Sequence, residues 1–151
     1  MRGRLPALSL AMVVAEFAGV GRGWGHVAWA LHQQKYVQDR TAADLRWAET
    51  FGHWIGNTDM HLGNISLTPT SRGFDLLPIY DMLPMAFAPI RGDLPEVSLR
   101  PPIRVVAEKA MWQETREAAA DYWSRIAGDE EVSASFRDIA ARQARQCNDL
   151  G

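Results

Sequence analysis

The strongest folding signal in this 151-residue chain is an amphipathic pattern that covers residues 42–55. Its apolar residues recur at the three- and four-residue spacing that places them on one helix face: Leu45, Ala48, Phe51, Trp54 and Ile55. Thr41 is the predicted N-cap, and Asp44 stands three residues later in a position like that of a capping box. Gly56 and Asn57 predict the end of the helix. A helix with one apolar face has to bury that face, so the chain predicts a globular fold.

Other elements surround this helix. A short helix is predicted before it, over residues 26–35. After it come two short apolar runs, residues 65–67 and 74–77, on either side of a turn that contains Pro and Gly. An irregular proline-bearing stretch then leads to two further helices, predicted over residues 106–126 and 133–146. The predicted fold class is mainly α with a small β-hairpin.

The first 22 residues contain patterns that need interpretation. Arg2 and Arg4 precede an apolar stretch, which resembles a secretory signal. However, Glu16 interrupts the stretch, and it is shorter than the roughly 20 apolar residues of a membrane span. We therefore interpret it as a buried internal segment. Glycines at every second position over residues 19–25 do not give the phosphate-binding pattern G-x-G-x-x-G, so these residues predict a flexible bend.

Composition limits the classes of partner and the cellular compartment. The net charge is −2 and the pI is near 6.1, so the sequence lacks the excess of positive charge that is typical of proteins that bind nucleic acid or anionic lipid. The single cysteine, Cys147, excludes both an internal disulfide and a Cys-rich zinc module. We expect no membrane contact and a reducing, cytoplasmic setting.

Most of the polar residues that could take part in catalysis or metal binding lie between positions 57 and 81. Asp59 falls in the loop after the amphipathic helix, and Asn64 follows five residues later, where a strand begins. The hairpin returns the chain beside that strand, so we expect Asp81 to lie near Asn64. Carboxylate and amide oxygens are suited to Mg²⁺, which keeps water and phosphate oxygens in its other positions. The five-residue spacing is also that of the Asp and Asn in a kinase catalytic loop.

Other interpretations of the same residues are open. Asp59 could cap a turn, although its spacing to Asn64 and the second Asp after a hairpin favour catalytic geometry. His53 and His61 are eight residues apart, and a zinc site would need further donors. A third alternative is a metal-dependent phosphohydrolase that uses Asp59, His61 and Asp81.

The wider string around these residues is more specific than the spacing alone. Residues 57–64 read N-T-D-M-H-L-G-N, and residues 80–84 read Y-D-M-L-P. Together they resemble the HipA family of kinase-like proteins, whose members carry an N/A-T-D-x-H-x-x-N loop and a downstream Y-D motif. Residues 80–85 resemble the YjjJ-type branch in particular, in which a winged-helix DNA-binding region can precede the kinase part. The resemblance is good over residues 8–89, and beyond them only a helical C-terminal region is expected.

The resemblance implies a fold and a domain organisation. The expected fold is a protein-kinase-like C-lobe of the HipA C-terminal type, formed by residues 1–151 as one domain. Within it, residues 1–22 are expected to be a truncated inter-lobe segment. The Gly-rich phosphate loop and the strand lysine of a kinase are absent, because the only lysines, Lys35 and Lys109, lie outside apolar strands. The chain therefore resembles the C-terminal lobe without its N-terminal lobe.

The resemblance also implies a role for each motif residue. Asp59 would be the catalytic base that orients a Ser or Thr hydroxyl. Asn64 and Asp81 would hold Mg²⁺ against the phosphates of ATP. His61 stands two residues after the catalytic Asp, where it would either hydrogen-bond the γ-phosphate or shape the loop.

The implied function is phosphoryl transfer from Mg-ATP to a Ser or Thr of a protein substrate, as the catalytic-loop half of a HipA-like toxin kinase. The expected partners are that protein substrate and an antitoxin or separate N-terminal kinase lobe. DNA would be reached only indirectly, through a partner or a missing winged-helix region. The alternative function is a catalytically silent interaction module that binds such a lobe or antitoxin.

Phosphoryl transfer depends on positioning and electrostatic stabilisation, so a lobe without half of its nucleotide clamp should be nearly inactive. We predict that the purified chain with Mg-ATP shows no turnover unless the missing lobe is supplied in trans. Transfer of labelled γ-phosphate measures this directly. Robust autophosphorylation by the chain alone would contradict the prediction.

Overall fold

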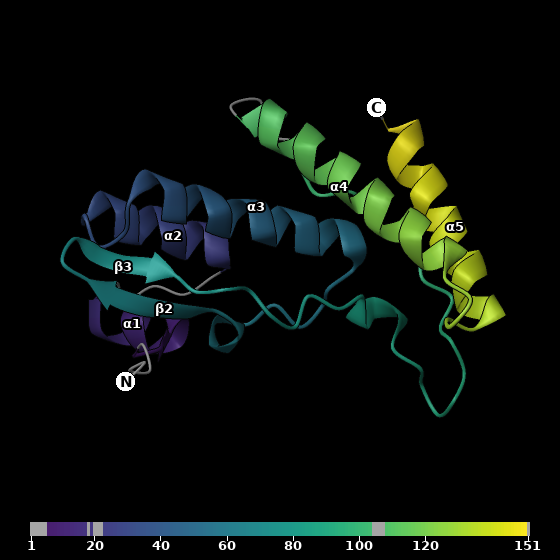
Figure 1. Cartoon of the computed structure of the whole chain (residues 1–151), viewed down its shortest axis with the longest axis horizontal. Coiled ribbons are helices and arrows are strands. Elements are labelled where there is room, and N and C mark those ends of the chain that lie inside the picture. The colour runs from purple at the N-terminus through teal and green to yellow at the C-terminus, as the bar shows by residue number, and fades with distance from the viewer. Residues whose placement is uncertain (1–5, 18, 20–22, 104–107, 151) are drawn as a thin grey trace. The chain divides into compact units, whose positions relative to one another are not determined.

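The computed structural model describes residues 6–17, 19, 23–103 and 108–150. Within them the chain is mainly helical and has one small antiparallel sheet, as the sequence predicts (Figure 1). The α-helices are α1 (Leu10–Phe17), α2 (Trp24–Gln33), α3 (Asp39–Ile55), α4 (Lys109–Gly128) and α5 (Ala134–Asp149). The strands are β1 (Leu8–Ser9), β2 (Ser66–Thr70) and β3 (Gly73–Leu76), and the 3₁₀ helices are η1 (Leu62–Asn64) and η2 (Met85–Phe87). Among the described helices, none combines the length and hydrophobicity that a transmembrane span requires.

The chain forms two compact units, and each unit consists of two separate stretches of the sequence. The first unit consists of Met1–Glu49 and Asp59–Met82, and the second consists of Thr50–Thr58 and Leu83–Gly151. Helix α3 runs through the boundary between Glu49 and Thr50. All of the predicted site residues belong to the first unit.

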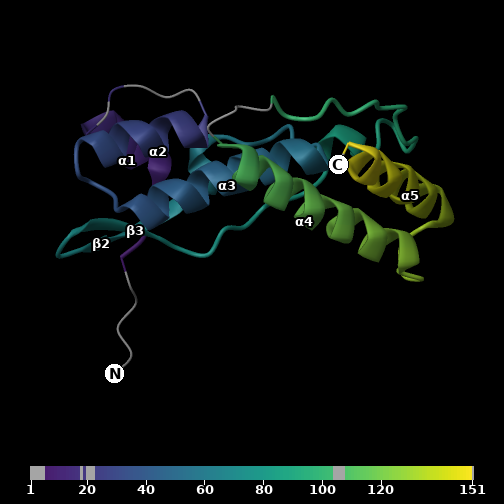
Figure 2. The same ribbon diagram turned by 90° about the horizontal axis from the view of Figure 1, so that it is seen from above.

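The core of the first unit is formed by α1, α2, the first part of α3 and the sheet. Its fully buried side chains include Leu10, Leu31, Leu45 and Leu67. Helices α2 and α3 lie side by side in both views of the ribbon (Figures 1 and 2). Strand β2 is central in the sheet, because it pairs antiparallel with both β1 and β3.

The apolar N-terminal stretch is part of this core. Leu10, Val13 and Val14 are buried at the spacing of one helix face in α1. Strand β1 precedes them and pairs Leu8 with Leu67 of β2. These contacts agree with the interpretation of a buried internal segment. Strand β1 was not expected, since two residues are too short to give an alternating pattern.

Helix α3 begins earlier than the sequence pattern predicts. Its first residue is Asp39, so Thr41 lies inside the helix and the predicted N-cap is wrong. Thr41 is buried because an earlier start places it one turn before Leu45 on the core-facing stripe. Asp44 does not complete a capping box. Its carboxylate oxygen instead lies 3.8 Å from the Nε atom of Arg40, one helical turn away. The predicted C-terminus is confirmed, because Gly56 adopts a left-handed φ of 74° directly after Ile55.

The predicted hairpin is confirmed, with a tighter turn than expected. Strand β2 extends to Thr70, and β3 begins at Gly73, whose φ is 114°. The amide of Phe74 donates to the carbonyl oxygen of Tyr36 at 2.8 Å, which brings the hairpin against the segment before α3. A Cβ atom at Gly73 would overlap that same carbonyl oxygen, so glycine is required there for two reasons.

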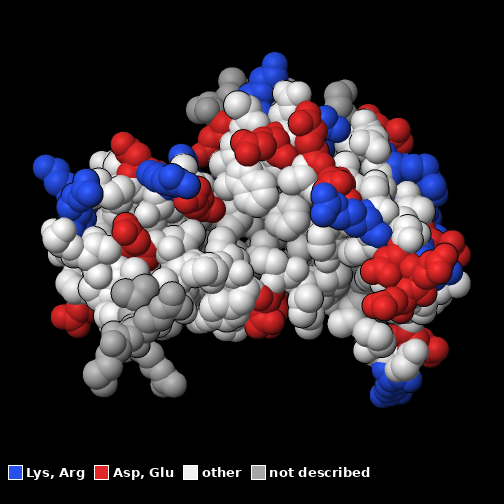
Figure 3. Space-filling view, viewed as in Figure 1, with Lys and Arg blue, Asp and Glu red and all other residues white. Residues whose placement is uncertain are grey.

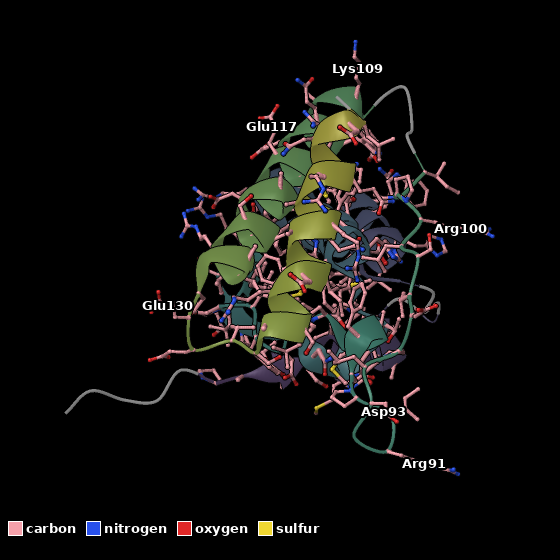
Figure 4. The ribbon with its side chains drawn as sticks, turned by 90° about the vertical axis from the view of Figure 1, so that its right-hand side faces the viewer. Arg91, Asp93, Arg100, Lys109, Glu117 and Glu130 are labelled. Atoms are coloured by element: carbon pink, nitrogen blue, oxygen red, sulfur yellow. The ribbon has the colours of Figure 1, made fainter. Side chains whose placement is uncertain are left out.

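Helices α4 and α5 form the frame of the second unit and lie side by side (Figures 1 and 4). Trp123 of α4 is fully buried and makes an edge contact with Phe87 of η2, at 5.6 Å between ring centroids. Arg116 of α4 is also buried, and its guanidinium donates to the carbonyl oxygen of Cys147 in α5 at 2.8 Å. The two C-terminal helices are joined by this polar contact and by the rings of Trp123 and Phe136, whose centroids lie 6.4 Å apart.

The predicted boundaries of these two helices are close to those in the structure. Ser133 is the N-cap of α5, and its hydroxyl accepts a hydrogen bond from the amide of Phe136 at 3.4 Å. The predicted start of the preceding helix, Val106, lies outside the described residues. Figure 4 shows Arg91 at the tip of a loop in this unit. In that loop Ile90 and Asp93 exchange backbone hydrogen bonds across two residues of positive φ, Arg91 and Gly92, which is the pattern of a tight hairpin turn.

We predict that Gly73→Ala lowers the free energy of unfolding by about 2 kcal/mol or more, because the new methyl group meets a backbone oxygen as well as an unfavourable φ. Gly92→Ala is the matched control, since Gly92 has a φ of 93° and open space around it. That control should cost only about 1 kcal/mol. Urea denaturation measures both values, and equal losses would contradict the role given to the Tyr36 contact.

Candidate functional site

The loop between Asp59 and Asn64 is fixed by its own hydrogen bonds. The backbone carbonyl of Asp59 accepts from the backbone amide of His61 at 3.0 Å and from the side-chain amide of Asn64 at 2.8 Å. Asn64 is only 6% exposed, whereas the Asp59 side chain is exposed. The structure therefore joins the first two predicted site residues directly and leaves the Asp59 carboxylate at the surface.

His61 shapes the turn that separates these two residues. It is the N-cap of η1, and its Nδ1 accepts from the backbone amide of Gly63 at 3.0 Å. In the neutral ring this acceptor role assigns the proton to Nε2. A Cβ atom at position 63 would lie 2.9 Å from Nδ1, so a larger residue there would push the ring away from this hydrogen bond. His61 therefore contacts the backbone of its own loop, and its role in the reaction stays a prediction.

Asp81 follows a residue, Tyr80, whose side chain contacts the loop. The backbone amide of Leu77 donates to the carbonyl of Ser66 at 2.9 Å, which continues the pairing beyond β3. The phenol of Tyr80 then donates to the backbone carbonyl of Gly63 at 3.0 Å. The Tyr80–Asp81 segment is therefore attached to the residue next to Asn64. Asp81 itself has a φ of 60°, a left-handed conformation that is uncommon for a residue other than glycine.

One further residue, Trp24, contacts the loop, and a second, Glu49, contacts Trp24; the sequence analysis identified neither. The indole nitrogen of Trp24 donates to the carbonyl oxygen of His61 at 3.1 Å. The backbone amides of Trp24 and Gly25 in turn donate to the carboxylate of Glu49, each at 2.8 Å. No local pattern could have identified this contact, because Trp24 and His61 are 37 residues apart. The spacing of Gly23 and Gly25, which leaves room for the Glu49 carboxylate, is at most a weak signal of the contact.

The donors at this site fit magnesium better than zinc. The described residues contain no group of three His, Cys, Asp or Glu side chains that could hold a metal ion. Mg²⁺ does not need such a group, since it is usually held by one or two carboxylates together with phosphate oxygens and water. The amide nitrogen of Asn64 donates to the Asp59 carbonyl, so the amide oxygen is the atom of this side chain that would coordinate a metal ion.

A cysteine nucleophile and a strongly basic surface find no support within the described residues. Cys147 is buried, and burial raises the pKa of its thiol to about 11, so the reactive thiolate is scarce at neutral pH. Figure 3 shows basic and acidic side chains interspersed over the displayed face. That distribution agrees with the small net charge of the chain.

Comparison with known proteins identifies a relative of part of this chain. No family model matches the sequence. The chain is 34% identical over 139 residues to Toxin YjjJ of Escherichia coli (strain K12), and the match covers 91% of the chain. It covers 31% of Toxin YjjJ, so the chain spans about a third of that relative's length. The chain is therefore related to a YjjJ-like toxin, which agrees with the branch that its motifs resemble.

We predict that Asn64→Asp destabilises the chain by about 2 kcal/mol at neutral pH, because a buried carboxylate would then face the Asp59 carbonyl without a proton between them. Burial and the facing oxygen raise the pKa of the introduced carboxyl in the folded state. Stability relative to wild type should therefore recover as the pH falls, because the protonated carboxyl can donate to the carbonyl. Urea denaturation between neutral and acidic pH tests this, and a deficit independent of pH would contradict it.

Proposed function

We propose that this chain is the catalytic-loop half of a HipA-like protein kinase, with a protein-kinase-like C-lobe fold. The reaction would transfer the γ-phosphoryl group of Mg-ATP to a Ser or Thr hydroxyl of a protein substrate. The observation that carries the proposal is the hydrogen bond between the Asn64 side chain and the Asp59 carbonyl. It holds an exposed carboxylate and an amide oxygen at the spacing of the Asp and Asn in a kinase catalytic loop.

In this proposal Asp59 is the base. Asp59 is an exposed residue, and its backbone carbonyl is held by two hydrogen bonds, so its side chain projects from a fixed point of the loop. It would accept the proton of the substrate hydroxyl as that oxygen bonds to the γ-phosphorus and the bond to the leaving ADP breaks. The Nδ1 atom of His61 accepts from the Gly63 amide, so in the neutral ring Nε2–H would be the donor to a phosphate oxygen.

Asn64 and Asp81 are the proposed metal ligands. When bound, Mg²⁺ would neutralise charge on the phosphate oxygens, as in other phosphoryl-transfer enzymes. Asn64 offers its amide oxygen, and Asp81 offers a carboxylate that is exposed. The left-handed backbone of Asp81 supports this role, because uncommon backbone conformations cluster at functional sites.

The relationship to Toxin YjjJ supports a place in a toxin–antitoxin pair. Since the chain spans about a third of that relative, activity would require the nucleotide-binding elements of a separate or preceding lobe. An antitoxin and such a lobe are the proposed protein partners, in the cytoplasm. DNA would be reached only through a partner or a winged-helix region.

A chimera in which this chain replaces the matching stretch of Toxin YjjJ tests the proposal. We predict that the chimera arrests growth and transfers labelled γ-phosphate, and that Asp59→Asn lowers the transfer rate by about 10²–10⁴-fold. Asp81→Asn should abolish transfer at Mg²⁺ concentrations that saturate the wild-type chimera, because a proposed metal ligand is lost. Asp75→Asn is the matched control, because Asp75 is an exposed carboxylate on β3 away from the loop.

Two outcomes would end the proposal. The first is a chimera that arrests growth without transferring phosphate, and the second is full transfer by the Asp59→Asn variant. Growth arrest that survives Asp59→Asn without phosphate transfer would instead favour the alternative function, a catalytically silent module that binds a lobe or an antitoxin. Thermal unfolding of each variant verifies that the substitution has not unfolded the protein.

A further inference from the structure

The central carbonyl of the Asp59–Asn64 loop is held from outside the loop by one side chain. The carbonyl oxygen of His61 accepts from the backbone amide of Asn64 and from the indole of Trp24, both at 3.1 Å. Trp24 is fully buried, so its ring has little freedom to move. The indole therefore connects the loop to the core of the first unit.

Trp24 is in turn fixed by a carboxylate on another helix. It is the first residue of α2, and the residue before it, Gly23, provides no side-chain cap. The two carboxylate oxygens of Glu49 accept from the backbone amides of Trp24 and Gly25, each at 2.8 Å. A carboxylate at this place satisfies amides that have no partner within the helix and is favoured by the helix dipole. Glu49 thus caps the N-terminus of α2 although it lies 25 residues later in the sequence.

Two glycines make room for this carboxylate. A Cβ atom at Gly25 would lie 2.7 Å from one Glu49 oxygen, and a Cβ atom at Gly23 would overlap the other. Gly23 also has a positive φ of 77°. The glycine pattern that predicts a flexible bend therefore contains, in its described part, a fitted contact for Glu49.

We propose that Glu49 and Trp24 are positioning residues for the catalytic loop. Glu49 fixes the start of α2, and the Trp24 indole then fixes the His61 carbonyl between Asp59 and Asn64. The chemical consequence rests on the proposed function. Small displacements of a reacting group are costly, since a shift of about 1 Å can lower a rate about 10²-fold. Neither residue is expected to touch the substrate or the metal.

Trp24→Phe removes the indole N–H and keeps most of the packing. We expect hydrogen exchange at the Gly63 and Asn64 amides to accelerate about two- to tenfold, the range that corresponds to one lost hydrogen bond. Trp123→Phe is the matched control, because Trp123 is equally buried and its indole nitrogen has no hydrogen-bond partner within the described residues. It should leave exchange at those two amides unchanged. Equal exchange in Trp24→Phe and wild type would overturn the proposal.

Gly25→Ala separates positioning from simple helix stability. Alanine favours a helix interior over glycine, so the substitution alone should stabilise α2. Its Cβ atom would nevertheless displace the Glu49 carboxylate, so we expect faster exchange at Gly63 and Asn64. Glu49→Gln, which keeps one acceptor oxygen, should fall between wild type and Glu49→Ala. Slower or unchanged exchange in Gly25→Ala would overturn the role given to Glu49.

The chimera with Toxin YjjJ provides the chemical readout. There Trp24→Phe should lower kcat about ten- to 100-fold and leave the KM for ATP within about twofold, because the loop is misplaced while the nucleotide site is intact. A change in KM alone, or the same loss of kcat in Trp123→Phe, would overturn the proposal. If the wild-type chimera transfers no phosphate, the proposed function fails, and the exchange rates still decide whether Glu49 and Trp24 position the loop.

Discussion

The candidate site depends on one contact, the hydrogen bond from the Asn64 side chain to the Asp59 backbone carbonyl. A buried amide in this position has one oriented oxygen left, and the residue five positions earlier keeps its carboxylate at the surface. The contact therefore joins the two ends of a six-residue stretch, 59–64. In the proposed function one end would bind a cation, and the other would accept a proton.

The surrounding contacts hold this loop from two directions. On one side the Tyr80 phenol binds the Gly63 carbonyl and so attaches the segment of Asp81. On the other side the Trp24 indole binds the His61 carbonyl. The carbonyls of His61 and Gly63 thus accept from different segments of the first unit, which restricts the movement of the loop while Asp59 stays exposed. Phosphoryl transfer is catalysed largely by positioning the reacting groups, which would require a loop that is both preorganised and accessible.

Local signals in the sequence were sufficient for α2, α3, α4, α5 and the hairpin, whereas the α1 stretch was predicted only to be a buried apolar segment. Gly56 marks the end of α3 because a left-handed residue is needed there, and glycine provides it. Thr41 misled the prediction, since burial on the core-facing stripe outweighs its preference for a cap. The Trp24 contact could not be predicted, because hydrogen bonds between distant segments leave no periodic pattern.

The most direct test of the account is a crystal structure of the Toxin YjjJ chimera with Mg²⁺ and a non-hydrolysable ATP analogue. We expect the metal at about 2.1 Å from the Asn64 amide oxygen and an Asp81 carboxylate oxygen, as is usual for magnesium. The Asp59 carboxylate should face the γ-phosphate without binding the metal. A metal–nucleotide complex bound elsewhere, or an Asp59 carboxylate more than about 10 Å from the other two side chains, well beyond the spacing within a two-metal site, would contradict the account.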